Sequence, residues 1–247
     1  MTRKDIKISS RLIASMDVSK KNEAIEICKK INNKVDIIKV GLELLYHEGL
    51  GIVDTIKGFG YQIMLDAKLM DIPNTISGAL RGIAGLGVDI ITIHTLGGFN
   101  MLKTAMETIS QSCDEKKIKR PHLFGVTILT SLDDNDLDHM GFKNTYIDSV
   151  LNLALLASKA QIDGIICSPN EVAMLRAKIG DDIYIATPGI RLAGDGVGDQ
   201  KRVNTPRKAI ADGADYIIAG RSLTTKEDVA GTIQLFQEEI KGALKDA

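Results

Sequence analysis

The sequence DAKLMDIPNT, residues 66–75, places two acidic side chains around a basic one within six positions. They are Asp66, Lys68 and Asp71, and the apolar run YQIML comes directly before them. Buried charge is costly unless it is paired or used. Because residues i and i+2 of a strand share a face, we expect Asp66 and Lys68 to point one way and Ala67 the other.

A fourth charge, Lys39, ends the apolar run DIIKVG and gives an alternating series with Asp66, Lys68 and Asp71. Such an array can hold a lysine protonated in a desolvated pocket, ready to donate a proton. The alternative is a network of salt bridges that only closes one end of the fold. The motif D-x-K-x-x-D alone does not separate the two, but its place at the end of a core strand favours the chemical interpretation.

Eight short apolar runs, rich in β-branched residues, indicate strands that are covered on both faces. They span residues 11–17, 35–41, 61–68, 88–95, 122–130, 163–169, 183–190 and 215–222. Segments with helical period separate them, and 20–33 and 145–161 are the clearest. Eight strands that alternate with helices predict an α/β fold, a (β/α)8 TIM barrel, with residues 1–247 as a single domain.

Helix starts are marked as well. Asn170 precedes one helical segment, Thr225 precedes another, and Pro206 opens a third. A doubly wound sheet would need a glycine-rich phosphate fingerprint after the first strand, and MDVSKKNEA at 16–24 contains no glycine. The barrel is therefore the favoured architecture.

Barrels of this kind carry their active sites at the C-terminal ends of the strands. The runs end in polar residues or glycine that would gather at this mouth: Asp17, Lys39, Asp66, Lys68, His94, Thr130, Gly189 and Arg221. Arg221 follows Gly220, and a guanidinium beside an accessible backbone amide suits a phosphate dianion. The long glycine-rich loop 187–206 reads as a phosphate-binding lid or as a flexible surface loop.

Composition excludes some classes of function. A net charge of −1, 4% aromatic residues and no Trp give no indication of nucleic acid or an anionic membrane as partner. No apolar run reaches the roughly 18 residues of a membrane span, and the N-terminal run is too short for a signal peptide. Three cysteines without metal-like spacing predict reduced thiols. We expect a soluble, cytoplasmic protein.

Other polar residues are assigned structural roles. His94 is an acid or base, or a packed and hydrogen-bonded residue, and we favour the second. The aspartates of SLDDNDLDHM at 131–140 lack the spacing of a calcium loop and indicate a solvated helix start. We interpret the charged stretch 113–122 as a solvated loop, and Met64 and Met70 as core residues.

The segment IMLDAKLMDIPNT resembles the signature of the orotidine 5′-phosphate decarboxylase family. The resemblance extends along nearly the whole chain, with the other motifs in the expected order. They are DIIKVG, VTILTSL, TPGIR, GDQKRVNTP and AGRSL. The resemblance implies decarboxylation of orotidine 5′-monophosphate to uridine 5′-monophosphate and CO2, the last step of de novo UMP synthesis, without a metal or an organic cofactor.

The resemblance also implies roles for the charged array. Lys68 is the implied proton donor to C6 as CO2 leaves, and Asp66 sits against the substrate carboxylate. Lys39 and Lys68 offset the developing negative charge, and Asp71 enters from the partner subunit of a homodimer. A vinyl-type carbanion needs preorganised positive charge and a nearby acid, so the physical chemistry agrees with these roles.

Further contacts follow from the same resemblance. Asp17 and Lys39 would bind ribose hydroxyls, and Thr75 would reach the ribose in the partner's site. Thr130 is placed at the pyrimidine, with its neighbour Ser131 as the alternative. Phosphate contacts are implied for Gln200, Gly220 and Arg221, with Arg191 at the base of the lid.

Two rivals stay open. A related barrel decarboxylase that acts on a keto-sugar phosphate with magnesium shares the D-x-K-x-x-D pattern, but it carries an acidic metal ligand where Lys39 stands. Because a cation at this position opposes metal binding, we expect no metal. The other rival is a catalytically silent barrel that only binds nucleotides or a partner protein, and the complete charge array argues against it.

Overall fold

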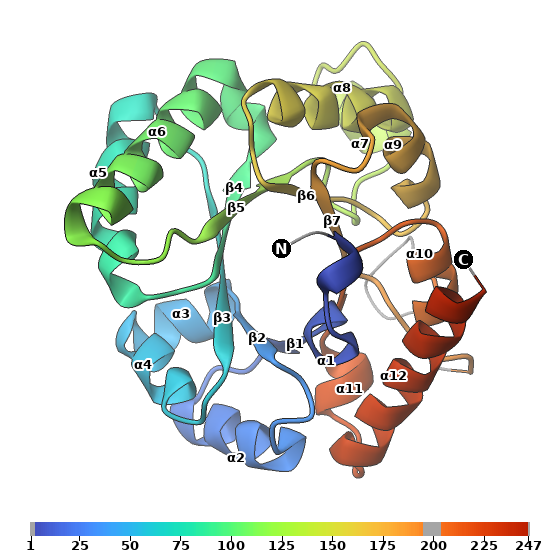
Figure 1. Cartoon of the computed structure of the whole chain (residues 1–247). Helices are drawn as coiled ribbons and strands as arrows, with labels where there is room; N and C mark the ends of the chain where they lie inside the picture. The colour runs from blue at the N-terminus through green and yellow to red at the C-terminus, as the bar shows by residue number, and fades with distance from the viewer. Residues whose placement is uncertain (1–2, 195–203, 247) are drawn as a thin grey trace.

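The apolar runs form eight parallel strands that close into a barrel in the part of the chain described by the computed structural model, residues 3–194 and 204–246 (Figure 1). Each strand pairs with the next, and β8 pairs with β1. The strands are β1 Leu12–Met16, β2 Ile37–Val40, β3 Gln62–Leu69, β4 Ile90–His94, β5 His122–Val126, β6 Gly164–Ile166, β7 Tyr184–Thr187 and β8 Tyr216–Ala219. The predicted (β/α)8 fold is confirmed.

Helices connect the strands and cover the outside of the barrel (Figure 1). The α-helices are α1 Ile8–Arg11, α2 Lys21–Ile31, α3 Leu42–Glu48, α4 Gly51–Lys57, α5 Pro73–Ile83, α6 Gly98–Lys116, α7 Asp134–His139, α8 Tyr146–Lys159, α9 Val172–Ile179, α10 Pro206–Ala211, α11 Arg221–Thr224 and α12 Val229–Lys245. Three short 3-10 turns are η1 Arg3–Asp5, η2 Ala84–Leu86 and η3 Thr95–Gly97. None of the helices in these described ranges is long and apolar enough to cross a membrane.

Two helices begin later than predicted. α9 begins at Val172, two residues after the expected cap Asn170. α12 begins at Val229 instead of directly after Thr225, because the carboxylate of Asp228 caps its first turn. In both cases a later acidic residue takes the N-cap position, Glu171 without a side-chain capping bond and Asp228 with one, so the predicted polar residue was the wrong marker.

Alternate residues of the strands separate an inner core from an outer one. The inner layer consists of Ile13, Ile37, Met64, Ile90, Phe124, Val126, Ile166, Ala186 and Ile218. On β1 to β4, the residue two positions beyond the inner apolar one is polar and buried: Ser15, Lys39, Asp66 and Thr92. Because side chains on one face of a strand repeat every two residues, these four polar side chains lie one layer nearer the C-terminal mouth than the inner apolar layer.

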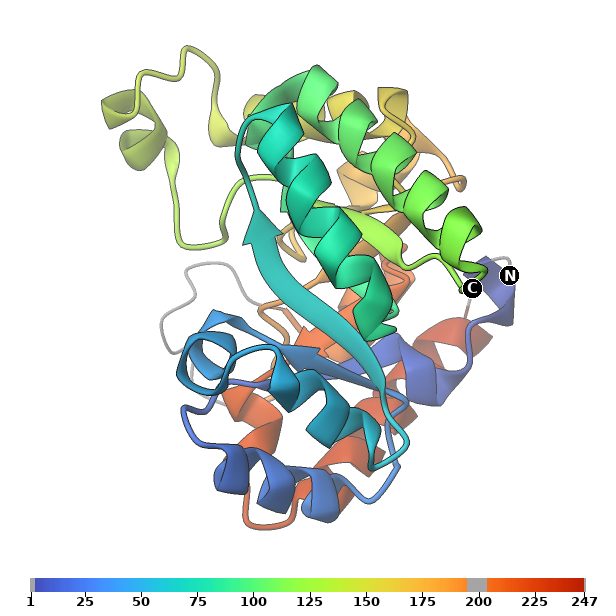
Figure 2. The same ribbon diagram turned by 90° about the vertical axis from the view of Figure 1, so that its left-hand side faces the viewer.

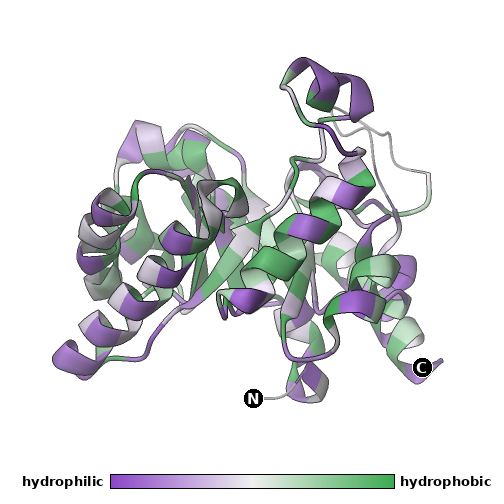
Figure 3. Ribbon diagram, turned by 90° about the horizontal axis from the view of Figure 1, so that it is seen from above, coloured by the Kyte–Doolittle hydropathy of each residue, from purple (hydrophilic) through white to green (hydrophobic). Residues whose placement is uncertain are grey.

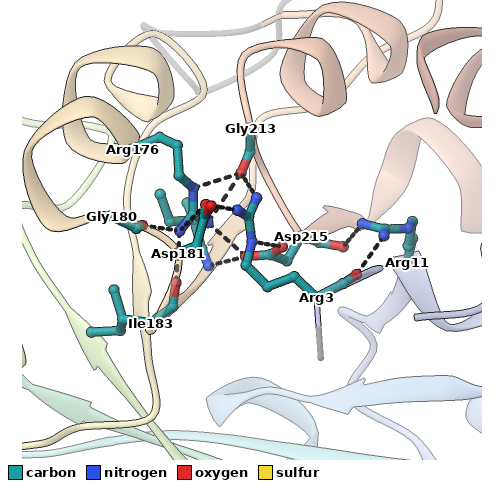
Figure 4. A network of polar contacts seen from close by, with 9 residues as sticks. Arg3, Arg11, Arg176, Gly180, Asp181, Ile183, Gly213 and Asp215 are labelled. Carbon is teal, nitrogen blue, oxygen red and sulfur yellow. Dashed lines mark hydrogen bonds and ion pairs between the residues drawn. The ribbon is translucent and has the colours of Figure 1, made fainter. Parts of the chain in front are cut away.

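The opposite end of the barrel is closed by ion pairs (Figure 4). Asp215, whose side chain is 1% exposed, accepts from Arg3 Nε at 2.6 Å and from Arg176 Nη2 at 2.7 Å, on different carboxylate oxygens. Arg11 donates to the backbone carbonyl of Asp215 at 3.2 Å. These contacts join the N-terminal η1 and α1 to α9 and β8.

Aspartates at regular positions also stabilise this closed end of the barrel. An aspartate precedes each even-numbered strand, at positions Asp36, Asp89, Asp163 and Asp215. The carboxylates of the last three accept a backbone N–H of the preceding odd-numbered strand, at distances of 3.1, 2.8 and 2.8 Å from Ile63, Leu123 and Ile185. Each carboxylate thereby satisfies a donor at a strand start and links a pair of strands.

Two predictions for individual segments need correction. The stretch 113–122 is a solvated loop only in part: residues 114–119 are exposed and 117–121 lie outside any helix or strand, but α6 continues to Lys116 and Arg120 makes a two-pronged pair with Asp163 at 2.6 and 2.7 Å. Met70 is 55% exposed instead of buried, whereas Met64 is fully buried as predicted. All three cysteines are free, as predicted, and the structure also buries all three.

The aspartates of 131–140 form a helix start, as predicted. Asp133 and Asp136 make a reciprocal capping box at the start of α7. Figures 2 and 3 show α7 as a mostly hydrophilic helix that stands away from the barrel, on the side opposite to the N-terminal η1.

Candidate active site

The mouth of the barrel is organised around the carboxylate of Asp66 at the C-terminal end of β3. Its Oδ2 lies 2.8 Å from Lys68 Nζ and 3.1 Å from Lys39 Nζ. Its Oδ1 accepts a hydrogen bond from Thr92 Oγ1 at 2.9 Å. Two ammonium groups from neighbouring strands therefore meet one carboxylate oxygen, and the predicted Lys–Asp–Lys series is present within a single chain.

At Asp66 and Lys39, the neighbouring charges outweigh the effect of burial on the pKa. Burial alone would raise the pKa of Asp66, but the charges of Lys39 and Lys68 outweigh it and lower this pKa from 3.8 to about 2. Burial alone would lower the pKa of Lys39, but Asp66 and Asp17 outweigh it and raise this pKa above its ordinary value. The carboxylate is ionised and Lys39 carries a proton at neutral pH.

Lys68 does not follow the simple alternation that the sequence predicts. Its φ of 47° is left-handed, and the pairing of β3 with β4 shifts between Leu65 and Leu69. A non-glycine residue in this region costs on the order of 1–3 kcal/mol and persists only where the surroundings impose it. Despite this irregularity in β3, the ammonium group of Lys68 lies beside Asp66. Ala67 packs outward against the helices, as expected.

Asp17 extends the array across β1. Its Oδ1 accepts from Ser15 Oγ at 2.6 Å and lies 3.4 Å from Lys39 Nζ. The backbone of Gly220, at the end of β8, approaches so closely that an added Cβ would collide with the Asp17 carboxylate. A larger residue at position 220 would therefore displace the Asp17 carboxylate from its present place.

A cavity of about 250 Å³ opens above these residues. One side of it is charged, with Asp17, Lys39, Asp66 and Lys68, and the other side is lined by apolar residues that include Val126, Ile128, Ile166 and Ile218. Five further predicted residues line it: Thr130, Gly189, Arg191, Gly220 and Arg221. A concave site with an apolar wall and a few convergent polar groups is suited to a small molecule, and Lys39, Lys68, Arg191 and Arg221 favour one that carries negative charge.

Other predicted site residues lie apart from this cavity. Ser131 is exposed and does not line it, so Thr130 is the hydroxyl that the structure brings to the site. Asp71 and Thr75 are also exposed, and Asp71 accepts from the N–H of Ile72 at 2.6 Å. Gln200 lies outside the residues that the structure describes.

His94 differs from its prediction as a hydrogen-bonded residue. It is partly buried, and within the described residues its Nδ1 is buried and has no hydrogen-bond partner. Burial and the nearby charge of Lys68 lower its pKa. Sequence reasoning also missed Thr92 and Ser15, whose hydroxyls bond to the two carboxylates of the site. The signal was their position two residues beyond an inner apolar residue.

Fold and site together define a (β/α)8-barrel protein with a Lys–Asp–Lys mouth beside an arginine that follows β8. The family model described as Orotidine 5'-phosphate decarboxylase / HUMPS family matches residues 10–236. The chain belongs to this family, and the resemblance noted from its motifs is confirmed.

Relatives match along nearly their whole length. Orotidine 5'-phosphate decarboxylase of Carboxydothermus hydrogenoformans is 40% identical over 237 residues, covering 96% of this chain and 98% of the relative. The protein of the same name from Bacillus cytotoxicus is 38% identical, with 95% and 99% covered. The crystal structure of orotidine 5'-phosphate decarboxylase from Lactobacillus acidophilus superposes with a TM-score of 0.83 at 33% identity, covering 94% of this chain and 99% of that one.

Proposed function

We propose that this protein decarboxylates orotidine 5′-monophosphate to uridine 5′-monophosphate and CO2, the last step of de novo UMP synthesis. The observation that carries the proposal is the pair of ammonium groups, Lys39 and Lys68, on one oxygen of buried Asp66 at the edge of the cavity. The printed names of the relatives support the same activity.

Lys68 is the proton donor in the proposed reaction. The bond between C6 and the carboxylate breaks, CO2 leaves, and the electron pair remains at C6. Lys68 Nζ gives its proton to C6 and takes one back from solvent afterwards, so charge and atoms balance. Asp66 lies against the substrate carboxylate, and Lys39 adds positive charge where the carbanion develops. All of these groups are preorganised by the contacts described above.

The remaining cavity residues bind the rest of the nucleotide. Asp17 and Lys39 hold ribose hydroxyls, and Thr130 reads the pyrimidine. The 5′-phosphate is bound at Gly220, Arg221 and Arg191, with Gln200 assigned from the family resemblance alone. Binding energy from the phosphate, remote from C6, can then lower the barrier at the reacting carbon.

The test is the loss of orotidine 5′-monophosphate followed by ultraviolet absorbance, with and without exhaustive chelation. Lys39 occupies the position where the keto-sugar rival needs an acidic metal ligand, so chelation should leave turnover unchanged. Activity that chelation removes and magnesium restores would favour that rival. Binding of the nucleotide without any turnover would favour the silent barrel.

We also propose that the active unit is a homodimer in which Asp71 and Thr75 reach the partner's site. The exposed surface around Asp71 supports this: its two neighbours in sequence, Met70 and Ile72, are 55% and 67% exposed. Large apolar side chains that flank an exposed carboxylate are typical of a surface that another chain covers. Asp71 contributes nothing to the cavity of its own chain.

Mixing Lys68→Ala with Asp71→Ala protein tests the shared site. In a mixed dimer one site carries both changes and the other carries neither. With random exchange about half of the dimers are mixed, so activity should recover to roughly a quarter of wild-type sites. Native mass spectrometry of tagged chains first establishes exchange. Complete exchange without recovery would mean that Asp71 serves its own chain.

A further inference from the structure

The bulge in β3 faces a single threonine of the neighbouring strand. β3 and β4 pair at Leu65 with Ile91 and again at Leu69 with Ile93. Residues 66–68 of β3 therefore lie opposite Thr92 alone. A bulge of this kind leaves a backbone donor without its partner in the ladder, and a buried N–H needs another acceptor.

Thr92 supplies that acceptor. Its Oγ1 accepts the backbone N–H of Lys68 at 2.8 Å and lies 2.9 Å from Asp66 Oδ1. A hydroxyl has one hydrogen to donate, and the N–H of Lys68 can only donate. The direction of the chain is therefore fixed: Lys68 N–H donates to Thr92, and Thr92 O–H donates to the carboxylate.

We propose that Thr92 is a positioning residue for decarboxylation, because its hydroxyl fixes the left-handed backbone of Lys68 and the orientation of the Asp66 carboxylate together. The proposal rests on the proposed function. Both oxygens of Asp66 are committed, Oδ1 to Thr92 and Oδ2 to the ammonium groups of Lys39 and Lys68. Rotation of the carboxylate would break contacts on both sides.

Thr92 acts through these neighbours and does not contact substrate. Its side chain is fully buried and does not line the cavity, whereas Asp66 and Lys68 do. Substitution should therefore leave ground-state binding of the nucleotide largely intact. It should reduce the chemical step, because misplacement of reacting groups by about 1 Å can cost on the order of a hundredfold in rate.

The experiment compares Thr92→Val, which keeps the branched shape, with Thr92→Ser, which keeps the hydroxyl. The matched control is Thr108→Val, because Thr108 on α6 is also buried and its hydroxyl bonds to Ser77 at 2.9 Å, away from the cavity. Steady-state kinetics with orotidine 5′-monophosphate give kcat and KM. Calorimetric titration with UMP gives product affinity, and thermal unfolding reports the fold.

Thr92→Val should lower kcat by at least about tenfold with KM and UMP affinity within about threefold. Thr92→Ser should recover kcat to within about threefold of wild type, and Thr108→Val should leave kcat unchanged. If Thr92→Val does not fold, Thr92→Cys takes its place with the same expectation, since a thiol is a weak donor.

Three results would overturn the proposal: a kcat for Thr92→Val within twofold of wild type, equal losses for valine and serine, or a loss carried by KM alone. Failure of the proposed function looks different, because the wild-type protein itself would then not turn over orotidine 5′-monophosphate. The two failures are thus distinguished by the wild-type arm of the same assay.

Discussion

Asp66 at the mouth of the barrel and Asp163 at the opposite end have the same depressed pKa for different reasons. Burial alone would raise the pKa of both carboxyl groups, yet both fall from 3.8 to about 2. At Asp66 the charges of Lys39 and Lys68 outweigh burial. At Asp163 hydrogen bonds from Arg120 and from the backbone N–H of Leu123 do so.

The difference lies in what holds each carboxylate. At the closed end, the carboxylate oxygens of Asp163 and Asp215 accept hydrogen bonds from arginine guanidinium groups and backbone N–H groups. Arg176 also donates to three backbone carbonyls. At the mouth, the partners of Asp66 are lysines and a hydroxyl, and the group borders a cavity. A shifted pKa alone therefore does not mark a functional site, and the lysine partners and the adjacent cavity are what distinguish Asp66 from Asp163.

The largest expected effect separates the two ends by activity. Lys68→Ala should reduce turnover by more than the roughly 10²–10⁴-fold of general acid catalysis alone, because in the proposed reaction Lys68 also stabilises charge. The control is Lys119→Ala at the closed end, where Lys119 lies 3.1 Å from Asp89 and is largely exposed, and its turnover should stay at the wild-type level. If Lys68→Ala kept more than a tenth of wild-type turnover, the mouth and the closed end would no longer differ in their importance for activity.

The second effect separates the two ends by stability. Asp215→Asn leaves Arg3 and Arg176 without the buried carboxylate, and removal of one partner of a buried pair costs roughly 3–5 kcal/mol. Urea denaturation should report this loss, while kcat of the folded protein stays unchanged. An Asp215→Asn protein of wild-type stability and reduced kcat would reverse the roles assigned to the two ends.

The smallest effect is a pH dependence at the closed end. The pKa of Asp163 is lower in the folded protein than the ordinary 3.8, so its ionised form stabilises the fold above pH 4. This contribution is lost as pH falls from 4 towards 2, and amounts to about 2 kcal/mol. Asp163→Asn should flatten the pH dependence of unfolding free energy in this window. Parallel curves for wild type and variant would contradict the explanation.

The barrel was predictable because alternation and run length are local properties. The inner residues Ile13, Ile37 and Met64 and the polar residues two positions beyond follow directly from a period of two. The positions of Lys39 and Asp66 at one mouth follow from the same period. Asp228 at the start of α12 was missed because several polar residues compete for one N-cap.

The bulge was not predictable because it depends on register between two strands. Alternation alone gives Lys68 an ordinary extended backbone, whereas the structure gives it φ of 47° opposite Thr92. The role of Thr92 follows only from that register. Likewise, Arg120 pairs with Asp163, 43 positions further along the chain. Because the charged stretch 113–122 has no partner nearby in sequence, the sequence predicted only a solvated loop there.

The pairing of β1 with β8 sets the order in which the newly made chain can close. Arg11 bonds to the carbonyl of Asp215, 204 residues further along. At ribosomal rates of about 5–20 residues per second, roughly 10–40 s separate their synthesis. During that interval one edge of β1 has no strand to pair with, and an open edge is a template for aggregation. Closure of this barrel therefore awaits the last strand, and until then the nascent chain carries an open strand edge that only its own C-terminal segment can cover.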